Sequence, residues 1–563
     1  LPLSNDKKYL HVAFGKNDNG DHLYKKINKY LELDSYSSQD FTPLYSKTEY
    51  DAIIISYHGS SSSPYASNII PPEIVADINK ISKNNNIILN LFLNPYSLNS
   101  FKSIDNFETI VIGYQNNIIS QEITADLLYG IRSFKGKIPV SNNFYSVNHG
   151  ISLERKNIIG FSRPSYEGFD SNSLAYLDSI AKNAIDSMMT PGIQMLVSRK
   201  GKIVYNKSFG YHTYENLNKL ENDHIFDLSS ITKILATMPL VLQEYEKGKL
   251  SLETKLSELF PKTKLNDKGD ITLKEMLSHY ARLSPWIPFY EETLNKKDKP
   301  RSRFYKSNSR SSFSTPVTEN LFLKSNYRNK IFKSILDSEL REDLEYKYSD
   351  LPFYFLKFWF EDIYDKPLDV LAYERVFKTL GLKRTMFNPH EKINLDEIVP
   401  SERDDFFRYS KLHGYVHDEG AAMLGGISGH AGLFSNSYEV AVVLQTMIQK
   451  GAYNNQRLFS SDSFDTFNYC YYCDKDNRSG VGFDKPQIEG NHGSTFGGVS
   501  SNSFGHFGYT GSMAWADPEE EIIFVFLSNR TYPTRENTLL QTSNIRTRSQ
   551  EIVYKSLIDS EWK

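Results

Sequence analysis

Short runs of apolar, β-branched residues alternate with polar, helix-like stretches over the first 150 residues of the chain. The apolar runs are YLHVAF (9–14), DAIIISY (51–57), NIILNLFL (87–94) and ETIVIGY (108–114). The helix-like stretches include PPEIVADINKISKN (71–84) and SQEITADLLYGI (120–131). Strands that alternate with helices predict an α/β domain, in which a parallel sheet carries helices on both faces. GKIPVS (136–141) is expected to add a last strand at the edge of this sheet.

A cluster of Pro, Gly, Ser and Asn at about 160–172 predicts a linker, which gives two domains, 1–163 and 164–563. In the second domain, a helix over 173–189 precedes two strands joined at Lys200-Gly201. Another pair of strands surrounds Asp517-Pro518 near the end of the chain. The region between the two pairs is mostly helical. The pattern predicts an α+β domain with an antiparallel sheet, built from both ends of the region, and a helical subdomain.

Charge and hydropathy exclude several classes of protein. The 563 residues include 65 Lys and Arg against 68 Asp and Glu, so the formal net charge is −3. This balance argues against a nucleic-acid partner and against binding of the whole chain to a membrane surface. The most apolar stretch, 351–360, is about half the roughly 18–20 residues that a membrane-spanning helix needs. No membrane span is therefore expected.

Two cysteines, Cys470 and Cys473, lie in YCYYCDKD. A redox CxxC motif normally follows a strand and opens a helix, whereas the flanks here are rich in Tyr. A zinc site needs further ligands nearby, and the His residues are distant in the sequence. The favoured interpretation is a structural pair or a local disulfide.

One pattern points to nucleophilic catalysis. Ser230 and Lys233, in IFDLSSITKILATMPL, lie at the start of a strongly apolar stretch that predicts a helix. A spacing of three residues on a helix brings the two side chains to one face. A buried Lys beside a Ser hydroxyl promotes deprotonation of that hydroxyl. The SxxK pattern by itself is weak, and a Ser/His/Asp triad stays open because the chain has 13 His residues.

Two later segments complete an ordered set. Tyr348-Ser349-Asp350 lies in YKYSDLPFYFL, and His506-Phe507-Gly508 lies in SFGHFGYTGS. With Ser230-x-x-Lys233, their order and separations resemble those of the penicillin-recognising serine hydrolases, which include class C β-lactamases, DD-peptidases and related esterases. The segments 271–285, 399–404 and 414–435 are similar to further stretches of this superfamily. The resemblance covers about residues 170–563.

The resemblance implies an acyl-enzyme mechanism. Ser230 would attack a carbonyl, and Tyr348, with its phenol pKa lowered by Lys233, would take the serine proton and pass it to the leaving group. The backbone N–H groups of Ser230 and Tyr509 would form the oxyanion hole. His506 would help to bind a substrate carboxylate. No metal and no organic cofactor is implied.

The chain departs from the superfamily pattern at two positions. Asp350 replaces the usual Asn of YxN, so that an anion would face the substrate amide. Phe507 replaces the Thr or Ser that normally hydrogen-bonds a substrate carboxylate, next to Gly508. Both changes are compatible with an esterase or amidase of different specificity. His417 and His430, which flank a Gly-rich turn, are expected to belong to a structural loop near the site and not to a metal centre.

The first domain resembles a different family. LPLSNDKKYLHVAFG, NLFLNPYSLN, VIGYQN and LYGIRSFKGKIPVS are similar to the C-terminal α/β domain of family-three glycoside hydrolases of the β-N-acetylglucosaminidase type. In that family the domain follows a catalytic TIM barrel, whose motifs are absent from this chain. The resemblance implies a fusion with the serine hydrolase domain, a barrel from the same precursor as a potential partner, and no glycosidase activity from these residues alone.

Three functions follow as hypotheses. The leading one is a bacterial, extracytoplasmic serine hydrolase acting on a cell-wall-related peptide, amide or ester, with a signal and an N-terminal region missing from the sequence. The substrate would be a small molecule or derived from peptidoglycan. The second hypothesis is a catalytically degenerate binding or scaffold module, suggested by Asp350 and Phe507. The third is the C-terminal part of a β-N-acetylglucosaminidase whose barrel is absent.

Overall fold

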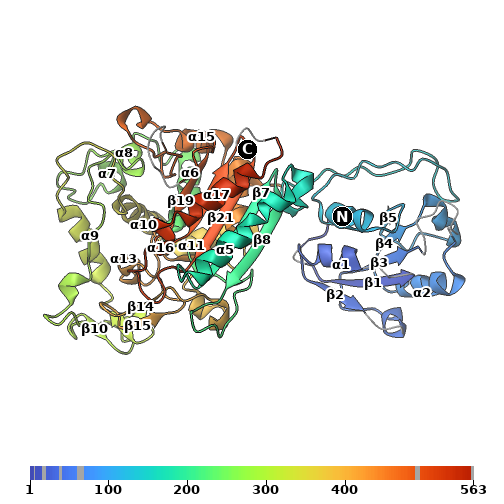
Figure 1. Ribbon diagram of the computed structural model, residues 1–563, viewed down its shortest axis with the longest axis horizontal. Coiled ribbons are helices and arrows are strands. Elements are labelled where there is room, and N and C mark those ends of the chain that lie inside the picture. The colour runs from blue at the N-terminus through green and yellow to red at the C-terminus, as the bar shows by residue number, and fades with distance from the viewer. Residues whose placement is uncertain (5–6, 16–20, 37–40, 60–68, 488–494, 560–563) are drawn as a thin grey trace. The chain divides into compact units, whose positions relative to one another are not determined.

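Contacts between residues divide the chain into two units, Leu1–Gly160 and Phe161–Lys563 (Figure 1). The computed structural model describes residues 1–4, 7–15, 21–36, 41–59, 69–487 and 495–559. Within these residues, no helix is both long enough and apolar enough to cross a membrane.

The first unit is built on a sheet of five parallel strands. They lie in the order β2 (Leu33–Tyr36), β1 (Tyr9–Gly15), β3 (Ala52–His58), β4 (Ile87–Phe92) and β5 (Thr109–Ile112). The predicted α/β class is confirmed. The predicted apolar runs form β1, β3, β4 and β5, whereas the short, polar β2 carries no pattern that the sequence analysis detected.

Helices cover both faces of this sheet, as expected. Helix α2 (Pro72–Ser82) buries Ile78 and Ile81 on one face, and α1 (Asp21–Ile27) and α3 (Ile118–Tyr129) pack on the other. The amino-terminal end of α3 is capped by Asn117, whose side chain accepts the Ser120 N–H. Gly130, with φ of 91°, ends the helix in the left-handed conformation that favours glycine.

The prediction of an edge strand at 136–141 is wrong. Among the described residues, this segment pairs with no strand of the sheet. Ile138 instead exchanges backbone hydrogen bonds with the loop that contains Asn148 and His149. Pro139 follows directly and has no N–H to donate to a ladder, which accounts for the end of any extended pairing here.

The second unit contains an antiparallel sheet made from both ends of its sequence, as predicted. The strands β19 (Phe504–Phe507), β20 (Met513–Asp517), β21 (Ile522–Ser528), β7 (Gly192–Arg199) and β8 (Lys202–Gly210) lie side by side in that order. Each is antiparallel to its neighbour. β19 carries His506 and Phe507 of the HFG segment, and it lies at the edge of the sheet beyond β20, in contact with η4 (Ser229–Ile231) of the helical part.

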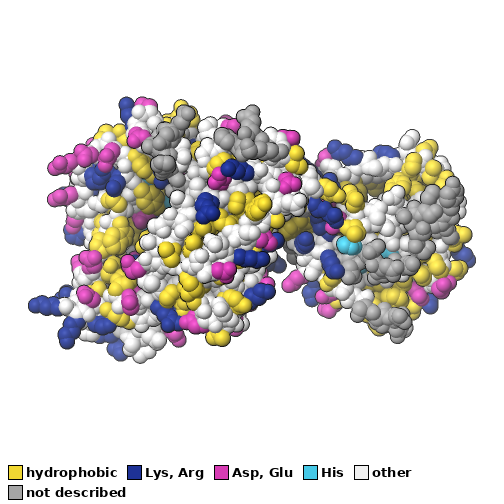
Figure 2. Space-filling view, in the orientation of Figure 1, with side chains coloured by type: hydrophobic (Ala, Val, Ile, Leu, Met, Phe, Trp, Pro, Cys, Tyr) yellow, Lys and Arg dark blue, Asp and Glu magenta, His cyan; other side chains and the backbone are white. Residues whose placement is uncertain are grey.

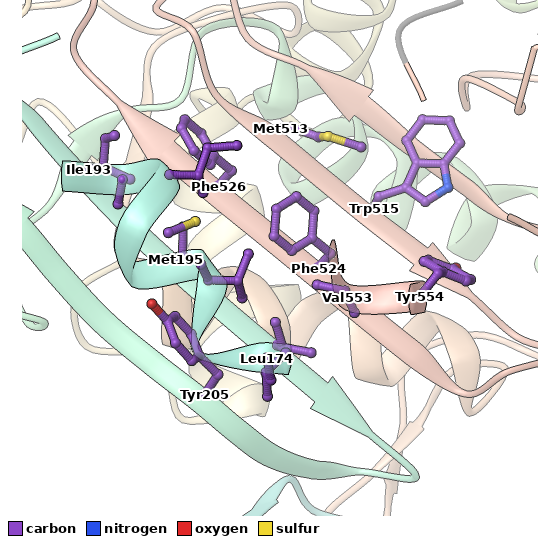
Figure 3. Close-up of a cluster of buried hydrophobic side chains, with 14 of the residues drawn as sticks. Leu174, Ile193, Met195, Tyr205, Met513, Trp515, Phe524, Phe526, Val553 and Tyr554 are labelled. Carbon is purple, nitrogen blue, oxygen red and sulfur yellow. The ribbon is translucent and has the colours of Figure 1, made fainter. Parts of the chain in front are cut away.

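One face of this sheet is covered by α5 (Tyr176–Asp186) and α17 (Ile545–Lys555) (Figure 1). Figure 3 shows the core that they enclose, with Trp515 and Phe524 from the sheet packed near Val553 and Tyr554 of α17. Helix α14 (Ser437–Ile448) contacts β7, β20 and β21 and belongs to the helical part, together with α6 (Met238–Glu246) and α10 (Leu351–Tyr364).

The segment that carries SxxK does not form one regular α-helix. A 3₁₀ turn, η4 (Ser229–Ile231), is followed by a π-helical stretch, η5 (Lys233–Thr237), and then by α6. π-helical turns inside helices are frequent at functional sites. Figure 2 shows acidic and basic side chains on the visible face of each unit, in keeping with the balanced net charge.

Cys470 and Cys473 form a disulfide, as the favoured interpretation of their spacing predicted. The sulfur of Cys470 also lies 3.4 Å from the carbonyl oxygen of Asn477. The Asn477 side chain donates a hydrogen bond to the carbonyl oxygen of Ser278. The disulfide loop is thereby fixed to the segment that contains His279.

Candidate active site

Ser230 lies in a backbone turn that Asp227 holds in place. Asp227 ends strand β9 (Phe226–Asp227), and its carboxylate accepts the N–H of Ser229 at 2.8 Å and the N–H of His417 at 2.6 Å. Ser229 has φ of 47°, a left-handed conformation that a non-glycine residue adopts only when its surroundings impose it. Burial raises the pKa of Asp227. None of the recognised motifs includes Asp227, although an acid between a strand and the Ser was a signal.

Lys233 connects three parts of the chain through its ammonium group. Its Nζ donates to Ser230 Oγ at 2.8 Å, to Asp350 Oδ1 at 2.7 Å and to the carbonyl oxygen of His430 at 3.3 Å. The side chain is fully buried. An ammonium group has three hydrogens to donate, so these three acceptors satisfy it completely.

Tyr348 approaches Ser230 from the loop that precedes α10. Its hydroxyl donates to Ser230 Oγ at 3.0 Å. The loop is held by His279, whose ring lies 4.7 Å from the Tyr348 ring and whose Nδ1 accepts the Ser349 N–H at 3.2 Å. The Ser349 hydroxyl donates to the Ser284 carbonyl at 2.6 Å. The segment 279–285 thus positions the Tyr348 hydroxyl, and the buried His279 has a pKa far below its usual value.

The expectation that Lys233 lowers the pKa of Tyr348 is wrong for this arrangement. Burial of the phenol, followed by the negative charge of Asp350, raises the pKa of Tyr348 well above its ordinary value. The hydrogen bond to Ser230 opposes this shift without reversing it. Tyr348 is therefore a neutral phenol in this structure, and it donates its hydrogen to Ser230.

His506 faces the site from β19. Its ring lies 5.9 Å from the ring of Tyr348, and its Nδ1 is 2.8 Å from the carbonyl oxygen of Phe507. Since a carbonyl only accepts, Nδ1 carries the hydrogen. Burial lowers the pKa of His506, against the opposing effect of Asp484. The imidazole is therefore neutral near pH 7, and the other ring nitrogen, Nε2, has a free lone pair.

Phe507 does not join the other residues of the site. Its ring lies 5.7 Å from the ring of Trp515 and 5.0 Å from the guanidinium carbon of Arg546. It packs against the core that α17 covers, whereas His506 contacts Tyr348. Successive residues of a strand point to opposite faces, so the expected substrate contact of the Phe507 side chain is corrected to a core contact.

The turn after β19 lies against the turn of Ser230. A Cβ built on Gly508 would be 2.8 Å from the carbonyl oxygen of Leu228, so only glycine fits at this approach. Arg530 fixes the next residue by donating to the Tyr509 carbonyl at 2.7 and 3.1 Å. Within the described part of the chain, the backbone N–H groups of Ser230 and Tyr509 have no hydrogen-bond partner. The Tyr509 side chain itself is half exposed.

The Gly-rich turn near His430 is structural. His430 Nε2 lies 2.9 Å from Asp418 Oδ1, its Nδ1 lies 2.9 Å from Ser428 Oγ, and its ring stacks on Tyr354 at 4.4 Å. This fixes the carbonyl oxygen that accepts from Lys233. Among the described residues, no group of three or more His, Cys, Asp or Glu side chains is arranged to hold a metal ion.

A sequence profile of the beta-lactamase family matches residues 178–545. The chain belongs to this family, and it is a serine hydrolase. Proteins of Salmonella enteritidis and Salmonella typhimurium, each described as "Putative D-alanyl-D-alanine carboxypeptidase", are 30% identical over 409 residues, which cover 67% of this chain and 87% of each relative. A penicillin-binding protein homologue from Caulobacter crescentus has the same fold, with a TM-score of 0.50 and 16% identity over 69% of this chain and 99% of its own.

Asp484 is a second residue of this serine hydrolase that the sequence analysis missed. Its backbone pairs in both directions with Gly505, next to His506, at 3.0 and 3.1 Å. Its side chain is buried, and Oδ1 has no hydrogen-bond partner among the described residues. Asp484 belongs to none of the three motifs, so no sequence signal marked it.

Proposed function

We propose that Ser230 is the nucleophile of this hydrolase and that Lys233 and Tyr348 act together as its base. The observation that carries this proposal is the convergence of Lys233 Nζ and the Tyr348 hydroxyl on Ser230 Oγ, at 2.8 and 3.0 Å. A nucleophile and its base must lie within hydrogen-bond reach for the serine to be activated. No His side chain of the described residues bonds to Ser230, which disfavours the triad that the sequence left open.

The proton path follows from the same contacts. Tyr348 first releases its hydroxyl hydrogen to solvent water. Ser230 Oγ then attacks the substrate carbonyl as its own proton passes to the phenolate oxygen of Tyr348. The Lys233 ammonium, 5.1 Å from the centre of the Tyr348 ring, would stabilise the resulting negative charge. Tyr348 then returns the proton to the leaving group, and the acyl group remains on Ser230 until water hydrolyses the ester.

The unpaired N–H groups of Ser230 and Tyr509 support an oxyanion hole at this site. Gly508 and Arg530 hold the second of these groups in a fixed position. Donors that are fixed before the reaction stabilise developing charge without reorganisation, and the loss of one such donor typically costs about 10²–10³ in kcat.

For the substrate, we propose a cell-wall-related peptide, amide or ester, processed outside the bacterial cytoplasm. The names of the Salmonella relatives point to D-alanyl peptides of this kind. An envelope enzyme also agrees with the disulfide between Cys470 and Cys473, because disulfides persist in oxidising compartments.

An activity-based probe tests the proposed nucleophile. A fluorescent alkyl phosphonate should label the protein at Ser230, as located by mass spectrometry, and Ser230→Ala should abolish the label. Ser171→Ala, at an exposed serine at the start of α4 (Ser171–Leu174), is the matched control and should label like the unaltered protein. A protein that stays unlabelled, while folded, would contradict the proposal and favour the degenerate binding or scaffold module.

The resemblance of residues 1–163 to the C-terminal domain of family-three glycoside hydrolases is a second proposal. The parallel sheet with helices on both faces supports it. It predicts that this chain alone does not hydrolyse 4-nitrophenyl N-acetyl-β-glucosaminide. Hydrolysis is expected only when a barrel polypeptide is added. Hydrolysis by this chain alone would contradict it.

A further inference from the structure

The side chain of Asp350 presents only acceptors to the site. Oδ1 is occupied by Lys233 Nζ, and the backbone N–H of Asp350 donates to the Pro285 carbonyl at 3.0 Å. Oδ2 has no hydrogen-bond partner in the part of the chain that the structure describes, and the side chain is 14% exposed. A carboxylate paired with an ammonium group has lone pairs but no hydrogen to donate. A substrate group that binds to Oδ2 must therefore be a donor.

His506 presents the same polarity. Its single hydrogen is used by the bond from Nδ1 to the carbonyl oxygen of Phe507, so Nε2 has only a lone pair to offer. The ring stays neutral because burial lowers its pKa. The two polar side chains that flank Tyr348 in this site, Asp350 and His506, thus both accept hydrogen bonds.

The charged side chains around Tyr348 and His506 also favour a positively charged substrate group. Lys233 is the cation at the centre of the site, and its three hydrogens are already bound within the protein. Two carboxylates oppose it, Asp350 and the buried Asp484, whose backbone pairs with the residue next to His506. The charges of both carboxylates act on Tyr348 and on His506. Around His506, one cation is thus opposed by two anions, and the further cation Arg478 acts on the neighbouring His279 and Tyr346.

We infer that the acyl group of the substrate carries a primary ammonium next to the carbonyl that Ser230 attacks, bound by Asp350 Oδ2 and His506 Nε2. This inference rests on the proposed function and narrows its substrate class to aminoacyl amides and esters with a free amino group. An ammonium group supplies both the hydrogens that two acceptors need and a charge opposite to that of the two carboxylates. A carboxylate at the same place would meet two acceptors and repulsion from like charge.

Three amides that share the D-alanyl group and the 4-nitroaniline leaving group differ in the charge at the amino end of the acyl group. D-Alanine 4-nitroanilide carries an ammonium, N-acetyl-D-alanine 4-nitroanilide is neutral, and N-succinyl-D-alanine 4-nitroanilide carries a carboxylate. In each case the C–N bond to nitroaniline breaks, the acyl group forms an ester with Ser230, and water releases the acid. We expect kcat/KM at pH 7 to fall at least about tenfold from the first compound to the third.

Two variants test whether Asp350 and His506 cause this order. Asp350→Asn supplies a donor, and His506→Lys supplies a cation, so each should reduce the preference for the ammonium over the carboxylate compound by about tenfold. Asp270→Asn is the matched control, because Asp270 is an exposed acid whose partner is Lys255, and it should leave the order unchanged. Phosphonate labelling of Ser230 verifies that each variant keeps a reactive serine. If Asp350→Asn does not fold, His506→Lys alone tests the inference.

The outcomes distinguish the inference from the function on which it rests. Equal rates for the three amides, preference for the succinyl compound, or no turnover by a protein that labels at Ser230 would each overturn the ammonium inference alone. Absence of both labelling and turnover would overturn the proposed function and the inference with it. A preference for the ammonium compound that both variants reduce would support the inference.

Discussion

Gly508 and Leu228 come so close that a Cβ on Gly508 would lie 2.8 Å from the Leu228 carbonyl oxygen. This contact joins the turn after β19 to the turn that holds Ser230. It sets the spacing between the two N–H groups that we propose as the oxyanion hole, one on Ser230 and one on Tyr509.

We therefore expect Gly508→Ala to lower kcat by about 10- to 100-fold, because a displaced turn moves one oxyanion donor. KM should change little, and the far-ultraviolet circular dichroism spectrum should stay the same. Gly269→Ala is the control, because a Cβ at this position would lie 3.8 Å from its nearest neighbour, the Cβ of Ser257, and fits without displacing it. If Gly508→Ala keeps full kcat, the turn does not supply a donor to the transition state.

Lys233→Met should remove activity while the chain keeps its fold. Loss of general base assistance typically costs about 10²–10⁴ in rate. The variant also leaves Asp350 without its ion pair, so the free energy of unfolding should drop by about 1–3 kcal/mol. In the double variant Lys233→Met/Asp350→Asn, urea unfolding should recover most of this stability, whereas the rate should stay low. Recovery of both would show that Lys233 matters only for packing.

The predictability of the site differs from residue to residue. The Ser230–Lys233 contact was predictable because a spacing of three residues on a helical segment is a local property. The rise in the pKa of Tyr348 was not, although Asp350 is only two residues away, because it depends first on the burial of the phenol, which only the tertiary structure creates. Asp484 also could not be predicted from the sequence, because only the pairing of two distant backbone segments brings it beside His506.

The fold, too, contains elements that the sequence predicted and elements that it did not. The apolar runs that form β1, β3 and β4 were clear from their β-branched composition, since buried parallel strands are apolar throughout. β2 (Leu33–Tyr36) was missed, because only its first residue is fully buried and a short polar edge strand carries little pattern. At 136–141 the apolar residues around Pro139 suggested a strand that the missing N–H of proline cannot complete.

Asp350→Asn should also shift the pH profile. The negative charge of Asp350 opposes the phenolate form and so raises the pKa of Tyr348. Removal of that charge lowers this pKa, so the basic form of Tyr348 appears at lower pH. If Tyr348 is the base, the acid limb of kcat against pH should move to lower pH, as measured with the neutral N-acetyl-D-alanine 4-nitroanilide. An unmoved acid limb would argue that another group limits the rate.

His212 should make stability dependent on pH. Burial, with a contribution from His224, lowers the pKa of His212 to about 3 in the folded chain. The unfolded chain binds a proton at this position below about pH 6.5, and the folded chain does not. Stability is therefore complete above pH 6.5 and falls by about 1.4 kcal/mol per pH unit as the pH drops toward 3. Urea unfolding at pH 7 and pH 5.5 should show this loss, and His212→Gln should reduce it.

Phe507→Thr should restore a hydroxyl of the kind found in related hydrolases without changing substrate preference. The Phe507 side chain packs on Trp515 and beneath α17, on the opposite face of β19 from His506, so a new hydroxyl there cannot reach the substrate. Loss of the ring should lower the free energy of unfolding by about 1–3 kcal/mol, since the residue is only partly buried. The succinyl and acetyl nitroanilides should keep their ratio of kcat/KM. A selective gain for the succinyl compound would show that residue 507 faces the substrate in the working enzyme.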